Sequence, residues 1–147
     1  MTNGSTTPKK LSIIVYDGHF DKVHYALVMA AAASAVGRPV TLFFTMGACR
    51  ALVSARDGEP PWRAMPVGEG GGTGGEMDDG FRAMGIAGFE ELLSSCAELG
   101  VRFMVCETGL RAMGLARADL SPDIPIDEGG VVGFLTDASR HGAVIVI

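Results

Sequence analysis

The sequence predicts a three-layer α/β domain of flavodoxin-like type, built on a mostly parallel five-stranded sheet. Short β-branched apolar runs alternate along the chain with amphipathic helical segments. The first strand, helix and second strand follow one another with short connections, which favours a right-handed crossover between parallel neighbours. The strand runs are apolar on both faces, a pattern typical of a sheet that is covered on both sides.

Each element is expected from its own local pattern. Strands are expected at residues 11–16, 40–45, 101–105, 124–126 and 143–147, and helices at residues 21–36, 89–99, 107–115 and 130–140. The negative charge of Asp21 favours a helix N-terminus, and Gly37 and Pro39 end that helix. Apolar residues at helical spacing predict the helix at 89–99, which Gly100 closes. Residues 48–54 are expected to form a helical turn or two.

The chain of 147 residues is long enough for one domain. Residues 1–10 are polar and are expected to form a disordered N-terminal tail, followed by a single domain over residues 11–147. A glycine-rich insertion is expected at about residues 56–88, because glycines give up more backbone entropy on ordering than other residues. Its glycine run lacks the Gly-Lys-Ser/Thr ending of a phosphate-binding loop, so we interpret it as a mobile lid or a disordered loop.

Composition excludes several classes of function. The net charge of −5 and the aromatic content of 7% argue against direct binding of nucleic acid. The N-terminus does not resemble a secretory signal, and the longest apolar helical stretch, residues 26–36, is shorter than the roughly 20 residues that cross a bilayer. Three cysteines without Cys-x-x-Cys spacing fit reduced thiols in the cytoplasm. We therefore expect a cytoplasmic protein without a membrane segment. A metal site is not expected either, because no cluster of His, Cys and Asp residues has a suitable spacing.

Ligands of open parallel sheets gather at the carboxyl ends of the strands, and two cysteines fall there. Cys106 ends a predicted strand and opens a predicted helix, where backbone N–H groups and the helix dipole favour the reactive thiolate. Glu107 opposes this effect unless its carboxylate points to solvent. Position alone leaves two interpretations open for Cys106, a reactive thiol and a buried core residue.

Other candidates are weaker. Cys49 follows the second strand beside Arg50, and His19 follows the first strand as a possible acid–base group. His24 is a possible ligand, although such a residue more often lies on a helix flank with a hydrogen-bond partner. Cys96 falls on the apolar face of a predicted helix and is expected to be a small buried residue.

Residues 11–44, 99–115 and 129–132 resemble parts of the DsrE/DsrF-like sulfur-relay family. Residues 11–44 look like the first βαβ unit of that family. The more specific match is LGVRFMVCETGLRAMGL, residues 99–115, in which Cys106 matches the family cysteine and Met113-Gly114 match its closing pair. Gly109 and Leu110 stand where serine and methionine are usual, and residues 129–132 resemble the entry to the family's final helix.

The resemblance implies a DsrE/F-like fold and a cytoplasmic homo-oligomer, a trimer or hexamer, that handles sulfane sulfur. Cys106 would accept a sulfur atom as a persulfide and pass it to a partner thiol, as a sulfur carrier or sulfurtransferase without metal or organic cofactor. His19 would shuttle a proton, and Cys49 would resolve the persulfide if it lies near Cys106. The partners would be sulfur-donor and sulfur-acceptor proteins or small thiols.

Two other functions stay open. The first is a non-catalytic DsrE-fold binding or assembly module within a homo-oligomer, which has kept the fold and lost the chemistry. The second is a flavin or nucleotide site at the same strand ends, which would show in the absorbance spectrum of the purified protein.

Overall fold

The computed structural model describes residues 9–147, so the predicted tail at residues 1–10 lies outside the described residues except for Lys9 and Lys10. The strands are β1 (Leu11–Val15), β2 (Val40–Phe44), β3 (Arg102–Cys106), β4 (Ile126–Gly129) and β5 (Ala143–Val146). The α-helices are α1 (Phe20–Ala35), α2 (Gly74–Ala83), α3 (Phe89–Glu98), α4 (Glu107–Ala112) and α5 (Val131–Asp137). The 3-10 helices are η1 (Met46–Leu52), η2 (Pro61–Ala64) and η3 (Arg117–Asp119).

The five strands form one parallel sheet in the order β4-β3-β2-β1-β5, which confirms the predicted fold class. Strand β2 lies at the centre, and all five of its residues are buried. A central parallel strand has both faces covered, which explains why its sequence, VTLFF, does not alternate between apolar and charged residues.

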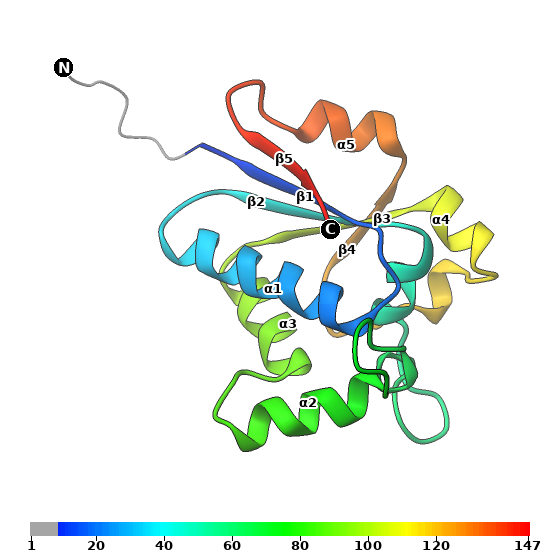
Figure 1. Cartoon of the computed structure of the whole chain (residues 1–147). Helices are drawn as coiled ribbons and strands as arrows, with labels where there is room; N and C mark the ends of the chain where they lie inside the picture. The colour runs from blue at the N-terminus through cyan, green and yellow to red at the C-terminus, as the bar shows by residue number, and fades with distance from the viewer. Residues whose placement is uncertain (1–8) are drawn as a thin grey trace.

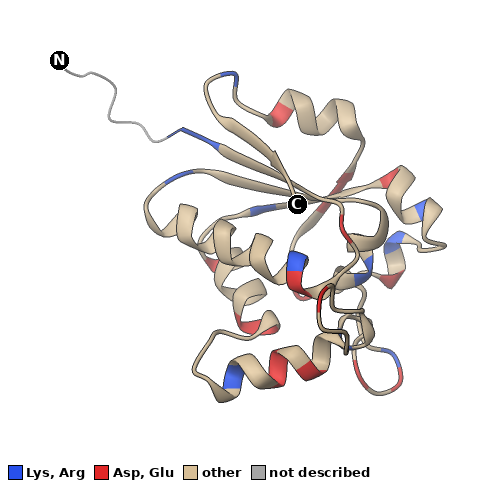
Figure 2. Ribbon diagram, in the orientation of Figure 1, with Lys and Arg blue, Asp and Glu red and all other residues tan. Residues whose placement is uncertain are grey.

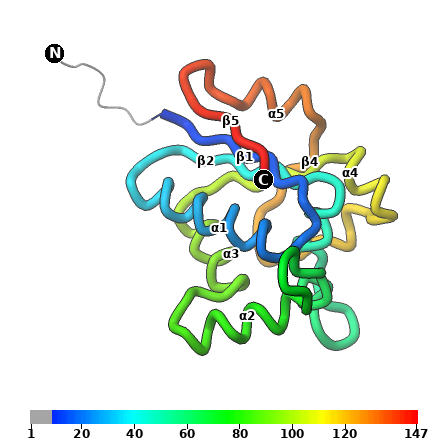
Figure 3. The backbone as a smooth tube through the Cα atoms, viewed as in Figure 1, coloured from blue at the N-terminus to red at the C-terminus, as the bar shows by residue number. Residues whose placement is uncertain are grey.

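The direction of each crossover places the helices in two layers. From β1 to β4 the chain moves steadily toward one edge of the sheet, and right-handed crossovers keep α1 and α3 on the same face. The last connection runs back across the whole sheet to β5, so the same handedness places α5 on the opposite face (Figure 1). The tube view shows α1 and α3 side by side, with α5 across the sheet from them (Figure 3).

The two faces of the sheet are covered unequally. The α1–α3 face carries the main core, whose sheet residues are Ile13, Val15, Leu42, Phe44, Phe103 and Val105. The opposite face has a small buried cluster of Phe43, Met104 and Cys106 with Phe134 of α5. On that same face, Val144 and Val146 of β5 are 47% and 66% exposed. Coverage on both sides is therefore confirmed at β2 and β3 and is incomplete at β5.

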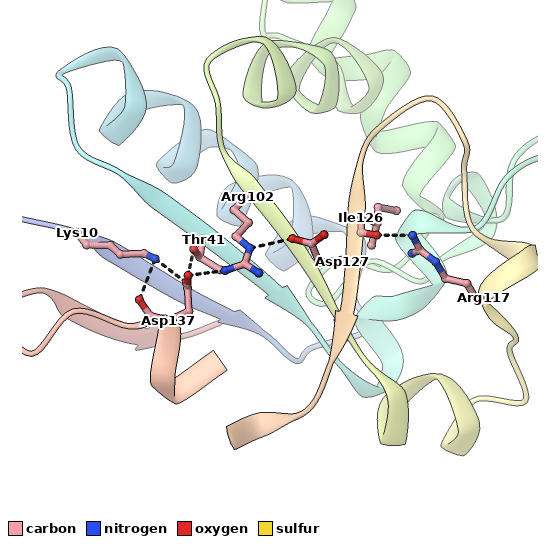
Figure 4. Close-up of polar contacts among 7 residues, drawn as sticks. All are labelled: Lys10, Thr41, Arg102, Arg117, Ile126, Asp127 and Asp137. Atoms are coloured by element: carbon pink, nitrogen blue, oxygen red, sulfur yellow. Dashed lines mark hydrogen bonds and ion pairs between the residues drawn. The ribbon is translucent and has the colours of Figure 1, made fainter. Parts of the chain in front are cut away.

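A polar network at the amino ends of the strands ties α5 to the sheet (Figure 4). The carboxylate of Asp137, the last residue of α5, accepts hydrogen bonds from Lys10 Nζ at 2.5 Å, Thr41 Oγ1 at 2.7 Å and Arg102 Nη1 at 2.6 Å. Arg102 also donates from Nε to Asp127 of β4 at 2.9 Å. The network joins α5 to four of the five strands or to the residues that precede them.

The insertion at residues 56–88 is not the mobile or disordered loop that its glycine content predicts. It contains η2 and the ten-residue helix α2, which begins with a capping box between Thr73 and Glu76. Gly74 is required for packing, because a Cβ on it would lie 2.5 Å from the carbonyl oxygen of Trp62 and 2.8 Å from the ring of Phe20. The glycine run therefore allows close packing against an aromatic cluster as well as turns.

Several predicted boundaries differ from the observed ones. Strand β4 begins at Ile126 instead of residue 124, because Pro125 has no N–H to donate to the sheet. Helix α5 spans Val131–Asp137 instead of residues 130–140. It ends where Lys10 Nζ donates to the backbone carbonyl of Asp137 at 3.0 Å and the chain turns to an extended conformation at Ala138. No helix in residues 9–147 combines the length and the apolar character needed to cross a membrane.

Candidate functional site

Three loops meet at the carboxyl edge of the sheet. The loop after β1 touches the loop after β2, since a Cβ on Gly18 would lie 3.2 Å from Gly47 Cα. The loop after β2 touches α4, since a Cβ on Gly109 would lie 2.6 Å from the backbone nitrogen of Met46. Met46 has a φ of +49°, a left-handed conformation that is uncommon for residues other than glycine. Backbone contacts thus join the segments that carry His19, Cys49 and Cys106.

Cys106 is the last residue of β3 and the N-cap of α4, as the sequence predicts. Cys106 is 4% exposed and packs with Phe43, Met104 and Phe134 on the face covered by α5. The thiol is therefore at a helix start and at the edge of the small core cluster at the same time. The position at a helix start agrees with a reactive thiol, and the burial agrees with a core residue.

Cys49 lies in η1 and is fully buried in the main core. Burial raises the pKa of the Cys49 thiol to about 12, and a negative charge on Cys106 contributes to the same increase. Cys49 and Cys106 are both free thiols, and they belong to different buried clusters. With so high a pKa, the Cys49 thiol is protonated at neutral pH and is a poor nucleophile.

His19 is the N-cap of α1 and is paired with Asp17, a residue that also lies at the end of β1. The Asp17 carboxylate lies 2.6 Å from His19 Nδ1 and accepts the backbone N–H of His19 at 2.8 Å. Partial burial pushes the pKa of Asp17 upward, but these hydrogen bonds and the charges of His19 and Lys22 outweigh it and lower the pKa. A carboxylate on Nδ1 fixes the ring and leaves Nε2 able to exchange a proton.

The sequence position of His19 after the first strand does not by itself predict its pairing with Asp17. The signal is available in the spacing: an aspartate after a strand, two residues before the first turn of a helix, accepts the backbone N–H at i+2 in an Asx turn. The histidine at that position then brings its ring to the same carboxylate.

Two other sequence candidates have structural roles. His24 is 5% exposed, and its Nε2 lies 2.9 Å from the carbonyl oxygen of Ala87, so it joins α1 to the segment before α3. Cys96 is fully buried, as predicted, and its Sγ donates to the carbonyl oxygen of Leu27 at 3.6 Å. Burial raises the pKa of the Cys96 thiol to about 11. Within the described residues, no group of three or more His, Cys, Asp or Glu side chains has the arrangement of a metal site.

No family model matches the chain. The uncharacterized protein YrkE of Bacillus subtilis (strain 168) is 26% identical over 157 residues, which cover 95% of this chain and 97% of that protein.

Two solved structures share the fold over almost the whole chain. The protein of unknown function MTH1491 from Methanobacterium thermoautotrophicum superposes with a TM-score of 0.60 at 16% identity, over 95% of this chain and 99% of that one. The ychN protein from E. coli superposes with a TM-score of 0.56 at 14% identity, over 94% of this chain and 97% of that one. The chain therefore has a DsrE/YchN-like fold.

Proposed function

We propose that the protein is a sulfur carrier in which Cys106 accepts sulfane sulfur as a persulfide and passes it to a partner thiol. The observation that carries the proposal is the place of Cys106, at the junction of β3 and α4 on the carboxyl edge of the sheet. The resemblance of residues 99–115 to the sulfur-relay family points to the same residue. The three free thiols fit the reducing environment of the cytoplasm.

The chemistry needs no cofactor to balance. The Cys106 thiolate attacks the outer sulfur of a thiosulfonate or thiosulfate, a sulfur–sulfur bond forms, and sulfinate or sulfite leaves with the electron pair of the broken bond. A partner thiolate then attacks the outer sulfur of the Cys106 persulfide and leaves as a new persulfide, which restores the Cys106 thiolate.

The neighbouring groups have assigned roles in this scheme. The amides in the first turn of α4 have no carbonyl partner within the helix, and we assign to them the stabilisation of the persulfide anion. We assign to the Asp17–His19 pair the role of accepting the proton of the incoming partner thiol. Because Cys106 is 4% exposed, a donor reaches the sulfur after a small displacement of the start of α5, which follows Gly129 and Gly130.

Incubation with thiosulfate or with glutathione persulfide, followed by intact mass spectrometry, tests the proposal. Wild type is expected to gain the mass of one sulfur atom and to lose it on treatment with a thiol reductant. Cys106→Ala is expected to gain none, whereas Cys96→Ala, a matched change at another buried cysteine, gains it as wild type does. Absence of a gain in wild type, or an equal gain in Cys106→Ala, would contradict the proposal.

A second candidate is a non-catalytic assembly module, and the burial of Cys106 together with an exposed apolar surface favours it. We call this surface the α5–β5 patch. Its members are Val131, Val132, Leu135, Val144 and Val146, each between 47% and 79% exposed. An exposed apolar patch of this kind, at a sheet edge that α5 covers incompletely, is typical of a surface that is buried in an oligomer.

If the protein self-associates through the α5–β5 patch, it forms a homo-oligomer, and a charged side chain introduced into the patch prevents its assembly. Leu135→Asp is expected to convert the oligomer to monomer, because burying an aspartate in an apolar contact is costly. Light scattering coupled to size exclusion gives the mass of each species. The control is Met84→Asp, which introduces the same charge at an apolar residue that is 69% exposed at the end of α2. A monomeric wild type would contradict this prediction, and an oligomer that takes up no sulfur would favour the second candidate.

A further inference from the structure

A cavity of about 390 Å³ opens on the α3 side of the molecule, beside the carboxyl-terminal end of η1. Helix α3 forms one wall, and the segments after η1 and before β4 form the others. Its lining includes the apolar side chains of Trp62, Leu93 and Ile124, and none of His19, Cys49 and Cys106. This volume falls within the range that small-molecule sites occupy in proteins.

The ionisable residues that line this cavity are all acidic. Glu90, Glu98 and Asp123 line it, and no lysine, arginine or histidine does. Figure 2 shows acidic residues at both ends of α3. Among residues 9–147, no ion pair involves any of these three carboxylates. The Trp62 indole nitrogen donates to Glu90 Oε1 at 3.3 Å, so an apolar and an acidic residue of the lining are hydrogen-bonded to each other. Behind the lining, the Arg63 guanidinium lies 5.3 Å from the centroid of the Trp62 ring, where Glu59 and Asp79 pair with it.

We infer that this cavity binds a small organic cation with an apolar body and an amine group. The apolar lining offers burial to the body, and each unpaired carboxylate attracts the ammonium group. The same carboxylates repel anions, including the sulfur oxyanions of the proposed relay. The inference is therefore independent of the chemistry of Cys106.

The fluorescence of Trp62 reports whether the cavity is occupied, because Trp62 is the one tryptophan in the sequence and lines the cavity. Phenethylamine is the probe, and phenylacetate and 2-phenylethanol present the same ring with a negative and a neutral group. A saturable change in tryptophan fluorescence is expected with phenethylamine. The affinity for both analogues is expected to be at least about tenfold weaker, because the favourable charge interaction is lost or reversed.

Variants test whether the carboxylates are responsible. The double variant Glu98→Gln/Asp123→Asn is expected to weaken phenethylamine binding about tenfold, because two attractive charges are lost. Asp57→Asn/Glu69→Gln removes the same net charge at two exposed residues outside the lining and is expected to bind as wild type does. Equilibrium dialysis measures the same affinities without relying on the indole.

The inference would be overturned by the absence of saturable binding, by equal affinity for phenylacetate, or by unchanged affinity in Glu98→Gln/Asp123→Asn. Binding of an oligolysine peptide without binding of phenethylamine would also overturn it, since the cavity would then be part of a protein-docking surface.

Discussion

Asp137→Ala is expected to lower the free energy of unfolding by about 3 kcal/mol, because three donors lose the carboxylate that they share. The Asp137 side chain is 14% exposed and that of Lys10 is 17% exposed, so solvent only partly replaces the lost contacts. The ammonium of Lys10 and the hydroxyl of Thr41 lose their hydrogen bonds to this carboxylate. Urea unfolding followed by circular dichroism measures the change.

The matched control is Asp127→Ala, which removes a carboxylate from the same Arg102. Asp127 is 60% exposed, and its ion pair with Arg102 is expected to contribute less than about 1 kcal/mol. An equal loss of stability in the two variants would contradict the role given to Asp137 in holding α5.

The effect of Asp137 also has a defined pH dependence. Partial burial pushes the pKa of Asp137 upward, but hydrogen bonds from Lys10, Thr41 and Arg102, together with the charge of Lys10, outweigh it and lower the pKa. A carboxyl group whose pKa is lowered by folding stabilises the folded state at pH values above its pKa in the unfolded chain, about 3.9. This contribution is lost as the pH falls through the pKa of the same group in the folded protein. The difference between wild type and Asp137→Ala should therefore be constant above about pH 5 and shrink below about pH 4.

Gly109→Ser is expected to destabilise this protein by about 2–3 kcal/mol. A Cβ at this position would lie 2.6 Å from the Met46 backbone nitrogen and 2.7 Å from Thr45 Oγ1. The backbone cannot yield as a side chain does, so either α4 or the loop after β2 must move. Glycine at position 109 is thus required by the close approach of these two segments.

Gly80→Ala is the control for this substitution. Nothing lies within 4 Å of a Cβ built on Gly80, which is inside α2, and alanine is favoured over glycine in a helix by up to about 1 kcal/mol. Gly80→Ala should therefore raise the free energy of unfolding while Gly109→Ser lowers it. A Gly109→Ser protein as stable as wild type would show that the contact between α4 and Met46 is looser than described.

The sequence allowed the strands, the main helices and the strand-end position of Cys106 to be predicted, because each depends on local pattern. A short, mostly apolar run such as residues 40–44 is typical of a buried strand in a parallel sheet, and a polar residue or glycine after it marks the edge where sites form. The prediction of Cys96 as a buried residue succeeded for the same reason, since its place on the apolar face of α3 is a matter of helical spacing.

Other features depend on contacts between distant segments and were not predictable from local pattern. The order of α2 depends on the packing of Gly74 against Trp62 and Phe20, whereas glycine composition alone favours disorder. The incomplete cover at β5 follows from the strand order, which places β5 next to β1 at the edge of the sheet. The burial of Cys106 depends on its contact with Phe134, a residue of α5 that lies nearly thirty residues later in the chain.

The position of the added sulfur in wild-type protein is the most direct measurement of the proposed relay. After incubation with thiosulfate or glutathione persulfide, the protein is alkylated, digested and analysed by tandem mass spectrometry. The account predicts a persulfide on the peptide that contains Cys106, with Cys49 and Cys96 recovered as thiols. Sulfur on Cys49 or Cys96 instead of Cys106, or on none of the three, would contradict it.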